Sequence, residues 1–125
     1  MLLIRKPRKG DNVVAVEVKA KDRCIPCSPR KVNLVASMVR GMRVKQACDA
    51  LTFCKKAVSR DVLKVLKAAV ANARENNGLD ADALYVKEAY VGKSVTLRRF
   101  MPRAKGGGGT IRKTFSNLTI VLSEV

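Results

Sequence analysis

The spacing of apolar residues changes along the chain. Near the start, Val14, Val16 and Val18 alternate with smaller or charged residues, and a period of two is typical of a half-buried strand. From position 28 onward the apolar residues recur every three or four positions, which is the period of a helix that buries one face. The sequence therefore predicts one strand followed by a helical region.

Three helices are predicted in this region. The first begins at Ser28 and Pro29, because serine is a good N-cap and proline is tolerated at the first helical position. Gly41 and Gly78 stand where the first and third helices should end. The predicted apolar faces are Val32, Val35, Ala36 and Val39 in the first helix, Val44, Ala47, Cys48 and Leu51 in the second, and Val62, Val65, Leu66, Ala69 and Ala73 in the third.

Strand patterns return in the last third of the chain. Pro102 and the four glycines at 106–109 separate two of these strands as a loop, which predicts a hairpin. One strand, three helices and then further strands, without strand–helix–strand alternation, predict an α+β fold with helices on one face of an antiparallel sheet. The predicted strands are 84–91, 95–101 and 111–122, the last with Leu118, Ile120 and Leu122 on one side and Thr119 on the other.

The composition narrows the possible functions. The 125 residues suit a single domain with a real core, and they carry 26 Lys and Arg against 10 acids, for a formal charge of +16. Such an excess is typical of proteins that bind nucleic acids. The chain has no histidine, the commonest general base and metal ligand, and its acids are scattered singly, so no catalytic residues and no enzyme activity are predicted.

The first residues indicate the expected compartment. The apolar residues 1–4 precede Arg5 and Lys6, the reverse of a signal peptide, and are too short for its apolar region. No segment approaches the ~20 apolar residues of a membrane span. We therefore expect a cytoplasmic protein with reduced thiols that does not bind membranes. Residues 1–10 are expected to form a basic arm, either frayed or ordered only by contact with RNA.

The predicted hairpin is unusually basic and long. At about 3.4 Å per residue, residues 95–107 would reach ~40 Å, which exceeds the ~30 Å diameter of a small domain, so the distal half should project. Like charges facing one another across a ribbon destabilise it, and phosphates of a polyanion would neutralise them. The alternative is a floppy, solvated loop. Between 93 and 113 the chain has no acid and seven basic residues: Lys93, Arg98, Arg99, Arg103, Lys105, Arg112 and Lys113.

Two further basic clusters lie on the predicted helices. Arg30 and Lys31 fall in the first turn of the first helix, where the helix N-terminus favours anions, so they are either phosphate contacts or ordinary surface charges. The third helix has a basic face that is either solvated or bound to RNA. This face comprises Arg60, Lys64, Lys67 and Arg74.

The sequence argues against two other kinds of ligand site, a mononucleotide phosphate loop and a platform for unpaired bases. The glycines at 106–109 lack the spacing to a Lys-Ser or Lys-Thr pair and the following helix that a mononucleotide phosphate loop requires. With two Tyr, three Phe and no Trp, the chain has too few aromatic residues for a stacking platform, which argues against single-strand recognition.

The four cysteines leave three interpretations open. Cys24 and Cys27 form a CxxC motif, and zinc would need two more ligands. Cys48 and Cys54 are the only candidates, but six residues apart on one helix they point about 120° apart. A redox pair would need a strand–helix–strand setting. The third interpretation, small reduced thiols without a metal or cofactor, is the one we favour.

Several segments together carry a resemblance that none of them carries alone. In order, and without large gaps from about Val13 onward, they resemble the universal large-subunit ribosomal protein twenty-two family, of bacterial or organellar type. The segments are SPRKVNLV at 28–35, VRG at 39–41, ANA at 71–73, NNGLD at 76–80, LYVKEAYVG at 84–92, LRRFMPRA at 97–104, IRK at 111–113 and NLTIVL at 117–122.

The resemblance implies a fold and a function. The fold is α+β, with three helices packed on a small three-stranded antiparallel sheet and a long protruding β-hairpin. The function is that of a structural constituent of the large ribosomal subunit, which binds large-subunit (23S-type) rRNA and assists its assembly next to neighbouring ribosomal proteins. The hairpin tip would line the exit tunnel of the nascent polypeptide. A stand-alone basic RNA-binding or RNA-chaperone module is the alternative.

The resemblance also implies domain limits and site residues. One domain of residues 1–125 would comprise a globular body, about 12–93 and 114–125, and the hairpin, about 94–113. A cytoplasmic ribosome is expected, and an organellar one remains open. The expected rRNA-binding residues are Arg30, Lys31, Lys93, Arg98, Arg99, Arg103, Lys105, Arg112 and Lys113. The expected tunnel-lining tip is Pro102, Arg103, Ala104, Lys105, Gly106, Gly107, Gly108 and Gly109.

Overall fold

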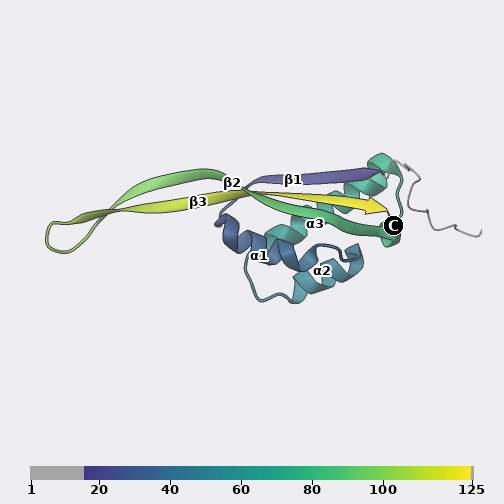
Figure 1. The fold of residues 1–125 in the computed structure, drawn as a ribbon, viewed down its shortest axis with the longest axis horizontal. Coiled ribbons are helices and arrows are strands. Elements are labelled where there is room, and N and C mark those ends of the chain that lie inside the picture. The colour runs from purple at the N-terminus through teal and green to yellow at the C-terminus, as the bar shows by residue number, and fades with distance from the viewer. Residues whose placement is uncertain (1–15, 125) are drawn as a thin grey trace, which may run out of the picture.

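Two long strands dominate the computed structural model, which describes residues 16–124 (Figure 1). β2 spans Leu84–Pro102, β3 spans Gly108–Glu124, and the shorter β1 spans Glu17–Ile25. They form an antiparallel sheet in the order β1-β3-β2, so that β3 is central. The α+β fold, the three-stranded sheet and the long hairpin predicted from the sequence are confirmed. The predicted basic arm of residues 1–10 lies outside the described residues.

The three predicted helices are present with the predicted apolar faces. α1 spans Pro29–Val39, α2 spans Val44–Phe53 and α3 spans Ser59–Asn77, and a short 3-10 helix follows at Ala81–Ala83. Every residue of the predicted faces is buried except Cys48, which is half-buried. Glycines 41 and 78 follow α1 and α3 with φ angles of 76° and 62°, the left-handed conformation that ends a helix. Within residues 16–124, no helix has the combined length and apolar character to span a membrane.

The helices cover one face of the sheet (Figure 1). α1 contacts β2, α3 contacts β1 and β3, and α2 packs on α3. The apolar residues Leu118, Ile120 and Leu122 of β3 are buried in the core that these elements share. The alternation of apolar residues in the sequence therefore correctly predicted which side of β3 packs against the helices.

The outer face of β3 is also buried, which the sequence did not predict. Thr119, Val121 and Ser123 expose 7% or less of their surface. They lie on the central strand, and their partners on β1 and β2 include long side chains, whose stems can cover a small residue between them. Lys87 of β2 donates a hydrogen bond across β3 to Glu17 of β1. The hydrogen-bonded side chains of Lys87 and Glu17 therefore help to cover the outer face of β3.

The loop at the hairpin tip is shorter than the glycine run predicts. Gly108 pairs with Pro102 and Gly109 pairs with Met101, so these residues continue the ladder and only 103–107 form the connection. Lys105 and Gly106 have φ angles of 60° and 68°, and the amide of Gly107 donates to the carbonyl oxygen of Ala104 at 3.3 Å. Two successive positive φ angles give a type I′ turn, whose twist matches that of the strands.

Candidate nucleic-acid interface

The distal half of the hairpin projects well beyond the helices and β1 (Figure 1). No residue between 93 and 113 is buried, so this part of β2 and β3 has no core of its own. The seven predicted cations of the hairpin are all exposed: Lys93, Arg98, Arg99, Arg103, Lys105, Arg112 and Lys113.

The strand register places two of these cations directly opposite each other. Arg98 of β2 pairs with Arg112 of β3, and like charges in this position destabilise a sheet. Among residues 16–124, no ion pair involves a hairpin cation. Arg40, in contrast, is held by the body, because its Nε donates to the carbonyl oxygen of Ala89 at 2.7 Å and its Nη2 to Oδ1 of Asn33 at 2.6 Å. The hairpin cations are therefore free to bind an anion outside the protein.

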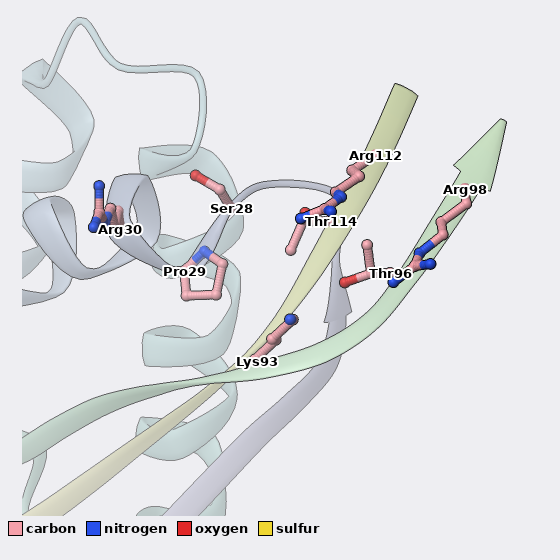
Figure 2. Close-up of a pocket in the computed structure, with 8 residues that line it drawn as sticks. All are labelled: Ser28, Pro29, Arg30, Lys93, Thr96, Arg98, Arg112 and Thr114. Carbon is pink, nitrogen blue, oxygen red and sulfur yellow. The ribbon is translucent and has the colours of Figure 1, made fainter. Parts of the chain in front are cut away.

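A groove of about 800 Å³ lies where the base of the hairpin meets the N-terminus of α1 (Figure 2). Three elements contribute to its wall, and Figure 2 shows Arg112 on β3 beside Arg98 on β2. No acidic residue lines the groove, so its charge is positive. The lining residues are Ser28, Pro29 and Arg30 from α1 and its cap, Lys93, Thr96 and Arg98 from β2, and Arg112 and Thr114 from β3.

Polar groups in the groove also suit an anion. Thr96 lines the groove, although its Oγ1 is shielded from solvent and has no hydrogen-bond partner within residues 16–124. Ser28 caps α1 with its backbone but makes no side-chain capping bond. The first turn of α1 therefore presents the positive end of the helix dipole to the groove, as in many phosphate sites.

A second groove, of about 420 Å³, adjoins the first and shares Ser28, Arg112 and Thr114 with it. Lys31 and Lys113 line this second groove, together with Pro26, Cys27 and Phe115. The structure therefore brings six of the predicted site residues together from two distant parts of the chain. We call them the hairpin-base cluster: Arg30, Lys31, Lys93, Arg98, Arg112 and Lys113.

The other three predicted cations lie farther along the hairpin. Arg99 follows Arg98, and its Nη1 donates to the carbonyl oxygen of Arg98 at 3.0 Å. The amide of Arg103 donates to the carbonyl oxygen of Gly107 at 2.9 Å, and Lys105 lies in the turn itself. The predicted tip residues thus divide into a ladder part, Pro102, Gly108 and Gly109, and a true turn, Arg103, Ala104, Lys105, Gly106 and Gly107.

The basic face of α3 forms a separate exposed surface. Arg60, Lys64, Lys67 and Arg74 are all exposed, and the only recorded partner within residues 16–124 is Asp61, 4.0 Å from Nζ of Lys64. Such a surface pair contributes little stability. A solvated face and an RNA contact both fit this geometry.

The cysteines are all free thiols. Cys24 is exposed and lies within β1, while Cys27 packs partly against the core. α2 ends at Phe53, so Cys54 follows the helix, yet residues 16–124 contain no group of three His, Cys, Asp or Glu side chains placed to hold a metal. Burial raises the pKa of the Cys48 thiol, which disfavours the reactive thiolate. The partly buried Cys27 and Cys48 fit packing residues, whereas Cys24 is an exposed thiol.

Some lining residues were not among the predicted site residues. Thr96 and Thr114 line the first groove, but a threonine in a strand pattern carries no signal beyond strand propensity. Ser28 and Pro29 were predicted only as a helix start. Their position next to the hairpin depends on packing between α1 and β2, which no local pattern encodes.

Comparison with known proteins agrees with this fold. The chain matches the family model described as ribosomal protein L22p/L17e over residues 20–123. It is 50% identical over 118 residues to large ribosomal subunit protein uL22 of Maricaulis maris, covering 94% of this chain and 90% of the relative. The protein of that name from Brucella suis is 51% identical over 109 residues, covering 87% and 84%, and that from Beijerinckia indica is 48% identical over 122 residues, covering 97% and 92%. The chain therefore belongs to the ribosomal protein L22p/L17e family.

Proposed function

We propose that this chain is a structural, non-catalytic constituent of the large ribosomal subunit and that it fastens folded rRNA through its hairpin-base cluster and projecting hairpin. Its relatives are named as large-subunit proteins. The observation that carries the proposal is the direct pairing of Arg98 with Arg112. They lie in a groove with two further cations and no acid, an arrangement that phosphates would neutralise.

The chemistry of the groove favours phosphate over base recognition. Arginine binds phosphate oxygens through two parallel hydrogen bonds, and the N-terminus of α1 adds favourable backbone dipoles. The deep, narrow major groove of A-form RNA excludes side chains, so specificity comes from the shape of the folded RNA. The body, 12–93 and 114–125, would rest on the RNA surface while the hairpin, 94–113, reaches into it.

The hairpin tip is the part that would line the nascent-polypeptide exit tunnel. It is the point farthest from the helices (Figure 1), and Ala104, Gly106 and Gly107 make most of its turn small. The side chains of Arg103 and Lys105 are its only charges. The exposed apolar residues Leu34 and Met38 on α1 provide a surface for neighbouring ribosomal proteins.

The RNA contact is tested by removing the paired arginines. The Arg98→Ala/Arg112→Ala variant should bind protein-free bacterial large-subunit rRNA at least tenfold more weakly, and the slope of log K against log salt should fall by roughly 1.5, about 0.7–0.9 for each lost phosphate contact. The matched control, Lys19→Ala/Lys21→Ala, removes two exposed charges from β1 and should change both quantities little. Equal effects of the two variants would overturn the assigned contact.

Ribosome association is tested in cells. A tagged copy should remain with large subunits through a moderate-salt wash, whereas a stand-alone RNA chaperone would be released steeply as salt rises. A photo-crosslinker that replaces Lys105 should capture nascent polypeptide in translating ribosomes. Capture of rRNA alone at this position would contradict the tunnel-lining role but leave the RNA contact standing.

A further inference from the structure

Phe100 is the most exposed large apolar side chain of the hairpin. It exposes 77% of its surface, although it lies within the ladder of β2 and pairs with Thr110. A phenylalanine left this exposed gains little from the hydrophobic effect in the free protein. Single exposed apolar side chains are common on protein surfaces, so exposure alone does not indicate a partner, but the surroundings of this ring do.

The ring occupies the space above a glycine on the opposite strand. A Cβ atom added at Gly108 would lie 2.4 Å from Cε2 and 2.5 Å from Cζ of Phe100, which no side chain could tolerate without moving the ring. Gly108 is the diagonal neighbour of Phe100 across the ladder. Because Gly108 has no side chain, the ring of Phe100 packs directly over its backbone, an arrangement known to stabilise glycines in strands. Most of the ring surface remains exposed to solvent.

The surroundings of the ring are cationic. Alternation along β2 and β3 places Arg98 and Arg112 on the same face as Phe100, and Arg98 is only two residues away, about 7 Å along the strand. Threonines make up much of the rest of this face. An apolar protein partner would have to desolvate both guanidinium groups, whereas a nucleotide offers an aromatic base for the ring and a phosphate for the arginines.

We propose that Phe100, seated on Gly108, stacks against one unpaired nucleobase of the large-subunit RNA, whose neighbouring phosphates bind Arg98 and Arg112. The inference rests on the proposed RNA-binding function and adds a base contact to it. Aromatic stacking accepts any base, because every base has a π-face. One ring serves one base, in keeping with the low aromatic content of the chain.

The absence of tryptophan from the sequence provides a direct test. Phe100→Trp introduces the only tryptophan of the chain, and the tryptophan emission should be strongly quenched when the protein binds protein-free bacterial large-subunit rRNA. Phe53→Trp is the matched control, because Phe53 is 84% exposed at the end of α2. Its emission should change little in the same titration.

Two variants separate the stack from the phosphate contacts. Phe100→Leu keeps an apolar side chain and Gly108→Ala displaces the ring, and each should weaken RNA binding about tenfold. The salt dependence should be unchanged, because the cations remain. Wild-type affinity of Phe100→Leu, or bound Phe100→Trp protein with undiminished or blue-shifted emission, would overturn the stack and leave the proposed function intact. Failure of the wild-type protein to bind this RNA would overturn both.

Discussion

The body half and the distal half of the hairpin are built from the same two strands, yet only one half has a core. In the body, Ile120 of β3 lies between Ala20 of β1 and Ala89 of β2, and all three are buried. In the distal half, Arg98 and Arg112 face each other, and no third strand of residues 16–124 lies beside them. The backbone ladder runs through both halves, with a shift of register between Lys93 and Thr96, so hydrogen bonding alone does not distinguish them.

The difference shows what keeps each half ordered. A backbone hydrogen bond contributes only about 0.5–1.5 kcal/mol net, and a two-stranded hairpin is marginal in water on its own. In the body, β1 and the helices add apolar burial, which is the dominant favourable contribution to folding. The distal half lacks this contribution and carries uncompensated positive charge, so we predict that its order depends on bound RNA.

Two isoleucines on β3 test this comparison with the same substitution. Ile120→Ala should lower the free energy of unfolding by about 2–5 kcal/mol, because it opens a cavity in the core. Ile111→Ala, at a position that is 38% exposed, should change it by less than about 1 kcal/mol. Urea unfolding followed by circular dichroism measures both. Similar losses would show that the distal half shares the cooperative core of the body.

The paired arginines should have opposite effects on binding and on the free hairpin. Arg98→Ala/Arg112→Ala weakens RNA binding but removes a like-charge pair, which should stabilise the free distal ladder by about 0.2–1 kcal/mol. The measurement is amide hydrogen exchange in residues 97–101 and 109–113, which should become slower. Faster exchange would mean that the arginines stabilise the hairpin themselves.

The smallest expected effect concerns the outer face of the body. The hydrogen bond from Lys87, and then its charge, lowers the pKa of Glu17 below its usual value of 4.5, and the same pair raises the pKa of Lys87 above 10.5. A carboxyl with a lowered folded-state pKa stabilises the fold above pH 4.5, and this contribution is lost as the pH falls through the folded value. The contribution of Lys87 is lost as the pH rises through its raised value.

Glu17→Gln should therefore be slightly less stable than the wild-type protein at pH 7. The difference should shrink as the pH falls from 4.5 through the lowered pKa of folded Glu17, and also as the pH rises from 10.5 through the raised pKa of Lys87. Urea midpoints at pH 3 and pH 7 measure it, with Glu88→Gln as a control on the same strand as Lys87. A difference that does not depend on pH would contradict the ion-pair explanation.

Local patterns predicted most of the fold, and the exceptions depend on distant neighbours. The helix ends at Gly41 and Gly78 and the buried side of β3 follow from capping and periodicity. The burial of Thr119 does not follow from a local pattern, because it requires long side chains from the two neighbouring strands. Gly108 and Gly109 were predicted as loop on composition, but their pairing with Pro102 and Met101 keeps them in the ladder.

The candidate site could be predicted from the sequence as a set of cations, but their arrangement in space could not. The excess of basic residues between 93 and 113 is visible in the sequence, and so is the basic start of α1. That Arg30 shares a groove with Arg98 and Arg112 depends on tertiary packing. The seat of Phe100 on Gly108 depends on the register that the turn sets, so no local pattern reveals it.

Hydrogen–deuterium exchange of the free protein and of the protein in reconstituted large subunits tests the central claim most directly. In the free protein, amides of residues 97–113 should exchange far faster than those of 84–91 and 118–122. In the particle, protection of 97–113 should rise by at least about 100-fold, more than 2.7 kcal/mol of added local stability, while the body changes little. Equal protection of the distal half in both states would contradict the account.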